Sequence, residues 1–213
     1  MPVVVVLGVV AVVAIVGFII VQSGGDRSAQ SEEAVEAEAN DDPSLPGEYV
    51  NVPEIYDGYW GNTGGTNTGE HVRRDVDYEA DGNSNPPAGG PHWSGQCGDD
   101  PSEAPAFCGP APWGIYNEPW DPETLVHNME HAGAVIWYNT ADQGVIDDLE
   151  SIVEDQLNDG KLLVMAPYRD MEAETIALTS WSRIEKFLVG EYSEERVKEF
   201  IDVHERRFNP EDF

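Results

Sequence analysis

The residues best suited to chemistry in this chain are histidines near the middle of the sequence. His127 and His131 belong to the run HNMEH, with three residues between them. On an α-helix this spacing places two imidazoles on one face, one turn apart, where both can bind one metal ion. His92 lies upstream as a third candidate ligand, and His71 lies further back as a fourth.

The metal expected at such a site is copper or zinc. Imidazole nitrogen suits both ions, and a thioether would shift the preference towards copper(I). Met165 belongs to the apolar run LVMAP, which predicts a strand, and from there it could reach the histidines. The competing interpretation is that these side chains only fill the core and bind no ion.

Glu130 lies between the two helical histidines and completes the pattern H-x-x-E-H of inverted zinc peptidases. In a hydrolase it would act as the general base. It could equally orient an imidazole from outside the ligand shell. Metal binding without catalysis is the preferred function, with a metal-dependent hydrolase and a metal-free structural or assembly module as alternatives.

The N-terminus predicts a membrane anchor. Residues 2–21 are almost all apolar and carry no charge, and about 20 such residues suffice for one helical crossing of the bilayer. We therefore expect a single-pass cell-membrane protein anchored through residues 1–22. The membrane is the only partner that this pattern identifies, and protein partners are unknown.

Residues 23–48 are acidic, small and free of aromatics, which is typical of a disordered tether. Residues 49–213 then form one domain, which we place outside the cytoplasm. Cys97 and Cys108 support this placement, because they are close in a Gly/Pro-rich stretch and suit a disulfide in an oxidising compartment.

The chain is strongly acidic, with 41 acidic and 11 basic residues and a net charge of −30. Such a charge repels nucleic acid, so no nucleic-acid partner is expected. The acids are spread along the chain after the apolar segment rather than confined to one tail. This distribution is typical of proteins from very salty environments, whose acidic surfaces keep them soluble.

Hydrophobic spacing predicts an α+β fold, with a small mixed sheet and flanking helices. Residues 49–113 are rich in Gly and Pro, which favours short strands and ordered loops. The later half predicts regular elements: helices near 122–133, 142–158 and 194–207, and strands near 134–138, 162–166 and 175–181.

Several motifs in order resemble a family of membrane-anchored proteins, domain of unknown function 3105 (DUF3105). They are NSNPPAGGPH at 83–92, GIY at 114–116, LVHNMEHAG at 125–133, APY at 166–168 and IALTSW at 176–181, with the closing segment 200–211. The resemblance implies an envelope protein of bacteria or archaea and no established activity. The chain departs from the family's common form at Ala88 and Gly89, and in an insertion that carries both cysteines.

The charge predicts that salt stabilises the domain. Self-repulsion among the acidic groups is strong at low ionic strength and is screened as salt rises. The melting temperature of the full-length chain should therefore increase as KCl is raised to molar concentrations, as measured by differential scanning fluorimetry. A flat or falling melting temperature would contradict this explanation of the acidic surface.

Overall fold

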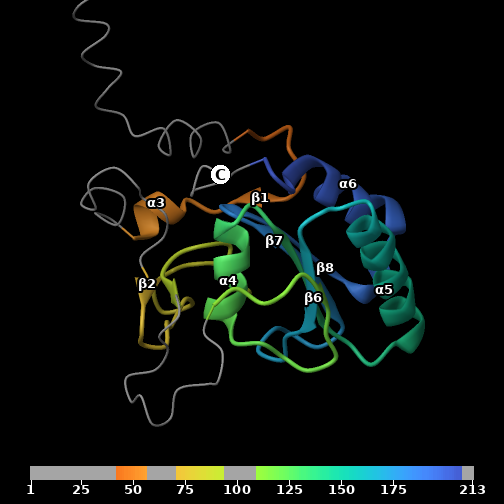
Figure 1. Cartoon of the computed structure of the whole chain (residues 1–213), viewed down its shortest axis with the longest axis horizontal. Coiled ribbons are helices and arrows are strands. Elements are labelled where there is room, and N and C mark those ends of the chain that lie inside the picture. The colour runs from red at the N-terminus through yellow and green to blue at the C-terminus, as the bar shows by residue number, and fades with distance from the viewer. Residues whose placement is uncertain (1–41, 57–70, 94–108, 208–213) are drawn as a thin grey trace, which may run out of the picture. The chain divides into compact units, whose positions relative to one another are not determined.

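The computed structural model describes residues 42–56, 71–93 and 109–207. A six-stranded mixed sheet forms its centre, in the order β1-β8-β7-β5-β6-β4 (Figure 1). β6 pairs in parallel with β5 and β4, and the pairs β5–β7, β7–β8 and β1–β8 are antiparallel. The strands are β1 Glu48–Tyr49, β4 Gly114–Ile115, β5 Ala134–Asn139, β6 Leu163–Pro167, β7 Thr175–Ser180 and β8 Arg183–Leu188.

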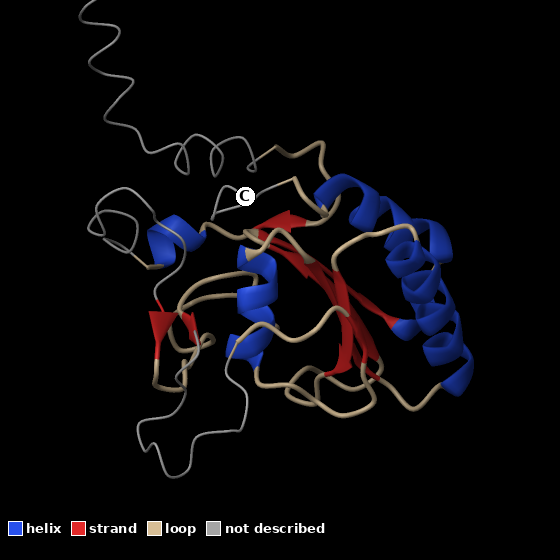
Figure 2. Ribbon diagram, in the orientation of Figure 1, coloured by secondary structure: helices blue, strands red, loops and turns tan. Residues whose placement is uncertain are grey.

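The sheet is covered on both faces, so its central strands are apolar on both sides (Figure 2). In β5, Val135 and Trp137 face helix α4 (Pro122–Glu130), within one core cluster. Ile136 and Tyr138 belong to the second cluster, with residues of α5 and α6. This alternation is the period of two that a strand imposes on its side chains.

The helices α5 (Gln143–Asn158) and α6 (Glu194–His204) begin at capping residues. The Asp142 side chain accepts hydrogen bonds from the first-turn backbone N–H groups of α5, and Ser193 does the same for α6. A short 3₁₀ helix, η1 (Val189–Glu191), connects β8 to the segment before α6. The inward stripes of α5 and α6 are fully apolar at their centres, and this burial holds both helices to the sheet.

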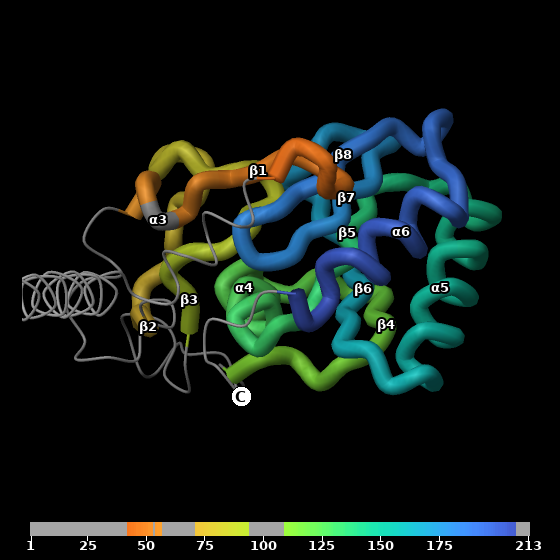
Figure 3. The backbone as a smooth tube through the Cα atoms, turned by 90° about the horizontal axis from the view of Figure 1, so that it is seen from above, coloured from red at the N-terminus to blue at the C-terminus, as the bar shows by residue number. Residues whose placement is uncertain are grey.

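A smaller layer lies on the other side of α4 from the sheet, as Figure 3 shows. It contains the short helix α3 (Val52–Ile55) and a two-stranded parallel sheet, β2 (His71–Val72) with β3 (His92–Trp93). The helix α4 is thus enclosed from both sides, and residues 123–130 are all buried.

The predicted α+β class and mixed sheet are confirmed, although β8 was not predicted. The charged residues Glu185 and Lys186 interrupt the apolar alternation that predicts a strand, although Ile184 and Phe187 on either side of them are buried. The folded part also begins before residue 49, because Arg183 donates to the carbonyl groups of Asp42 and Leu45.

No helix within the described ranges is long and apolar enough to cross a membrane. The predicted anchor at 1–22, residues 23–41 of the tether, and both cysteines lie outside the described residues.

The buried His204 should make the fold sensitive to acid. Burial lowers the pKa of His204 from 6.5 to about 4, although its hydrogen bond to the carbonyl of Pro46 acts in the opposite direction. The folded state therefore prefers the neutral ring, and this contribution is complete above about pH 6.5 and is lost as the pH falls towards about 4. Its size is on the order of 2–3 kcal/mol.

The substitution His204→Gln keeps a donor near Pro46 and removes the titration. Urea unfolding in the presence of a chelator should show that the variant loses less stability between pH 7 and pH 4.5 than the native chain. An identical loss in both proteins would mean that His204 does not control the acid response.

Candidate metal centre

The helix α4 carries two of the clustered side chains. It starts after Asp121 with Pro122 at its first position, as the sequence predicts. Leu125, Val126 and Met129 pack into the core cluster on the sheet. His127 and Glu130 are three positions apart, so both can project from one face towards the β2–β3 layer.

The other two side chains come from the β2–β3 pair, whose register places His71 directly opposite His92. The loop before His92 is held by Asn83, which donates to the Gly89 carbonyl and accepts from the Ala88 N–H. Gly90 has a φ of 114°, and a Cβ there would lie 2.6 Å from the ring of Tyr56. The close packing that fixes His92 therefore requires glycine at this position.

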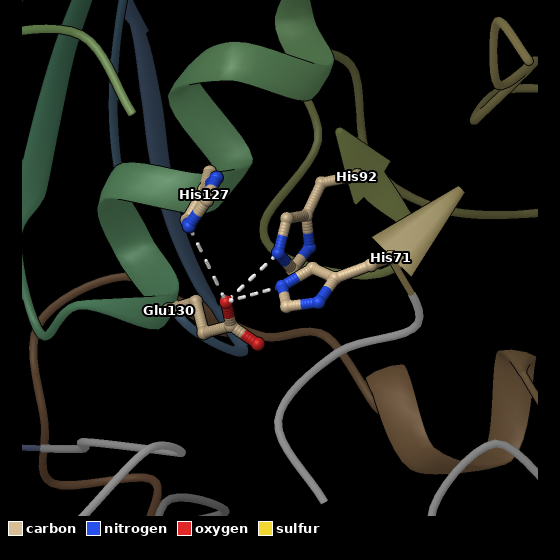
Figure 4. Close-up of side chains that lie close together, drawn as sticks. All are labelled: His71, His92, His127 and Glu130. Atoms are coloured by element: carbon tan, nitrogen blue, oxygen red, sulfur yellow. Dashed lines mark hydrogen bonds and ion pairs between the residues drawn. The ribbon is translucent and has the colours of Figure 1, made fainter. Parts of the chain in front are cut away.

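The four side chains converge on one point, as Figure 4 shows. One carboxylate oxygen of Glu130, Oε2, lies 2.8 Å from Nε2 of His92, 3.2 Å from Nε2 of His71 and 3.8 Å from Nε2 of His127. All the candidate ligand atoms are within 4.8 Å of one another. His92 and Glu130 are fully buried, and His127 nearly so.

The backbone fixes which nitrogen of two rings faces the centre. Nδ1 of His92 lies 2.9 Å from the Gly90 carbonyl oxygen, and Nδ1 of His127 lies 2.7 Å from that of Trp93. A carbonyl can only accept, so Nδ1 must carry the hydrogen in both rings. Nε2 is then the coordinating nitrogen, held in orientation by an outer hydrogen bond, as is usual for metal-bound histidine.

Two of the four groups are already in the protonation state that a metal ion requires. Burial and the nearby charge of His92 lower the pKa of His127 to about 3, so its ring is neutral at pH 7. Burial alone would raise the pKa of Glu130, but hydrogen bonds and charge from His71 and His92 outweigh it and lower the pKa to about 2. Glu130 is therefore an ionised carboxylate in a buried position.

The structure does not bring His131 and Met165 to this cluster. His131 is the C-cap residue of α4, and its ring stacks on that of His127 with 4.8 Å between centroids. Met165 belongs to the cluster on the α5–α6 face of the sheet, while its strand neighbours Val164 and Ala166 face α4. Strand alternation thus directs Met165 to the face opposite the histidines.

Glu130 takes the place that the sequence analysis gave to His131. The spacing of the helix allowed both pairs, because residues three and four positions apart share a face. The HNMEH run held the relevant signal, since a carboxylate is also a common ligand of transition metals. The structure places a carboxylate oxygen of Glu130 within 4.8 Å of the other candidate ligand atoms.

This α+β domain with a buried group of three histidines and a glutamate belongs to a defined family. The family model described as a protein of unknown function (DUF3105) matches residues 71–212, which include all four clustered side chains. The chain is therefore a member of the DUF3105 family, as its motifs indicated. Neither a curated protein nor a solved structure matches the chain.

The protonation states predict how many protons a metal ion displaces. His127 and Glu130 carry no proton at the centre near pH 7, so these two of the four ligands should release none when an ion binds. Binding of one divalent ion should release at most two protons. Calorimetric titration in buffers of different ionisation enthalpy measures this number, and a release of three or more would contradict the assigned states.

Proposed function

We propose that this domain binds one divalent transition-metal ion through His71, His92, His127 and Glu130. One observation carries the proposal: three imidazole Nε2 atoms surround a single buried carboxylate oxygen, while Nδ1 of His92 and His127 points outward to backbone carbonyls. The centre is thus built from inward-facing acceptors around one position.

Such an arrangement needs positive charge at its centre. A neutral ring with its hydrogen on Nδ1 presents a lone pair at Nε2, and a lone pair facing a carboxylate oxygen at 2.8 Å is repulsive. Either protons or a metal cation must lie between these atoms. A divalent cation satisfies all four groups at once, whereas each added proton serves one ring and brings buried imidazolium charges together.

The distances suit a small ion after slight adjustment. Metal bonds of about 2.0–2.2 Å in tetrahedral geometry place neighbouring ligand atoms about 3.3 Å apart. The separations of 2.8, 3.2 and 3.8 Å from Oε2 of Glu130 lie on both sides of that value. The candidate ligand atoms extend to 4.8 Å from one another, so binding would draw the side chains inward around the ion.

The donor set favours zinc over copper(I). Three nitrogens and one carboxylate oxygen are borderline-to-hard donors, and copper(I) prefers sulfur. The nearest thioether considered from the sequence, that of Met165, lies on the opposite face of the sheet. We therefore assign zinc or a chemically similar divalent ion rather than copper(I).

A binding role is better supported than hydrolysis by Glu130. A general base must remain available to a water molecule, but Oε2 of Glu130 faces all three imidazoles and Oε1 is buried. A cleft of about 550 Å³ borders the first turn of α4 at Glu123, yet none of the four clustered residues lines it. The ion would instead link α4 to the β2–β3 layer.

The same proposal places the domain outside the cytoplasm of a salt-adapted cell, anchored by residues 1–22. The apolar N-terminal segment supports the anchor, the Cys97–Cys108 spacing supports an oxidising compartment, and the net charge of −30 supports the salty environment.

Metal analysis of the purified full-length chain tests the proposal. We expect about one zinc ion per chain, removed by a chelator and restored by added zinc. At a free zinc concentration of about 100 times Kd, binding should stabilise the fold by about 2.7 kcal/mol, or roughly 5–10 °C in Tm. The variants His92→Ala, His127→Ala and Glu130→Gln should lose both the ion and the stabilisation.

His131→Ala is the matched control, because His131 is on the same helix and stacks on His127 but lies outside the cluster. It should retain the ion. Failure of the native chain to bind any divalent ion would overturn the proposal. Loss of the ion in His131→Ala alone, with the three variants still loaded, would place the centre elsewhere.

A further inference from the structure

We propose that the cleft beside the first turn of α4 binds a small organic cation that carries N–H groups, such as an alkylammonium or alkylguanidinium ion. The cleft has a volume of about 550 Å³ and is lined by the connection between β2 and β3, the start of α4 and the loop after β6. None of the four side chains of the candidate metal centre lines it. The inference therefore does not depend on a bound metal ion.

The lining of the cleft is acidic and contains no basic side chain. Arg74 and Arg169 are next to lining residues in the sequence but do not line the cleft themselves. The divalent ion proposed for the metal centre would be offset in part by ionised Glu130, so it would not neutralise the cleft. A positively charged ligand is therefore favoured and an anion is disfavoured. The acidic lining residues are Asp75, Asp77, Glu79, Asp121, Glu123 and Asp170.

Glu123 supplies a second observation, which the general acidity of the surface does not explain. This residue lines the cleft and is only 4% exposed. Its Oε1 accepts a hydrogen bond from the Val76 N–H at 2.6 Å, but no basic side chain in the described part of the chain pairs with its charge. Burial raises the pKa of Glu123, and the charges of Asp75 and Asp121 add to this effect, although the Val76 hydrogen bond opposes it. A buried carboxylate without a counter-charge is costly, and a cation from outside would remove that cost.

Asn85 indicates that the ligand carries hydrogen on nitrogen. Its Oδ1 is buried and has no hydrogen-bond partner among the described residues. Its amide nitrogen donates to the Asp170 carbonyl at 3.0 Å, which fixes the amide in this orientation. A ligand with several N–H groups can donate to Asn85 and to Glu123, whereas a quaternary ammonium ion can donate to neither.

The spacing of the carboxylates favours an organic cation over a metal ion. In the described ranges, the three histidines and Glu130 form the only group of three or more His, Cys, Asp or Glu residues whose ligand atoms lie within 4.8 Å of one another. The carboxylates of the cleft are thus too dispersed for Ca²⁺ or Mg²⁺, which need several oxygen ligands in direct contact. Trp93 and Tyr168 also line the cleft and offer aromatic surface to the carbon chain and the charge of the ligand. The volume is in the range of small-molecule sites.

Isothermal titration calorimetry of the full-length chain tests the inference, with n-butylguanidinium as the probe in one buffer of fixed ionic strength. One probe ion should bind per chain, at least about tenfold more tightly than tetramethylammonium, because only the probe can donate hydrogen bonds to the buried acceptors. Added Ca²⁺ should not displace it.

The variant Glu123→Gln keeps an oxygen that can accept from Val76 and removes the buried charge. It should bind the probe at least about tenfold more weakly than the native chain. Glu154→Gln is the matched control, because it removes the same charge from an exposed position on α5, away from the cleft. It should bind as the native chain does, and an unchanged melting temperature and metal content of both variants would show that the fold is intact.

Four results would overturn this inference while leaving the proposed metal site untouched. The native chain could fail to bind the probe, or it could bind tetramethylammonium equally well. Ca²⁺ could displace the probe, which would make the cleft a site for an inorganic cation. Equal weakening in Glu123→Gln and Glu154→Gln would mean that the acidic surface as a whole attracts the probe.

Discussion

The buried carboxylate of Glu130 is the constraint on which the rest of the centre depends. An ionised group without solvent exposure is costly unless opposite charge and hydrogen bonds surround it. In the proposed centre a divalent cation, held together with His71, His92 and His127, would meet this demand. Their arrangement also explains why α4 is enclosed on both sides, since water at this point would compete for the carboxylate. The sheet supplies the rigid support, and the β2–β3 layer supplies the cover.

The two layers differ in what holds them together. The sheet and its helices α5 and α6 are stabilised by two apolar clusters that continue across several strands. The β2–β3 layer has strands of two residues each. It combines apolar packing of Val52, Val76 and Tyr78 in the core cluster with side-chain hydrogen bonds, such as that of the Trp93 indole with the Arg74 carbonyl. An ion that joins His71 and His92 to His127 and Glu130 would add a direct link between this layer and α4. This is why we assign the centre a role in joining the layers.

The sequence was informative where one local rule decided the outcome. Helical periodicity predicted α5 and α6, and the capping residues Asp142 and Ser193 mark their starts. It was less informative where the i+3 and i+4 spacings of a helix allowed two different pairs. The helix geometry allowed His127 to pair with Glu130 or with His131, and the choice depends on where the β2–β3 layer lies.

The pairing of His71 with His92 could not be derived, because it joins segments 21 residues apart in a two-residue ladder. The position of Met165 could have been predicted, since strand alternation alone places its side chain on the other face of the sheet from those of Val164 and Ala166.

The acidic surface and the buried centre respond to ions in different ways. Surface carboxylates act collectively, raise the local concentration of cations of any kind and are screened within a few ångströms in concentrated salt. The inner group is shielded from that screening by its burial, and it selects by donor type and geometry rather than by charge alone. A net charge of −30 therefore cannot explain a specific ion at this place. Three imidazoles can, because sodium, potassium and magnesium prefer oxygen donors, while zinc and its neighbours accept nitrogen. In the proposed centre the histidines would therefore give a preference for zinc-like ions over monovalent and hard divalent cations.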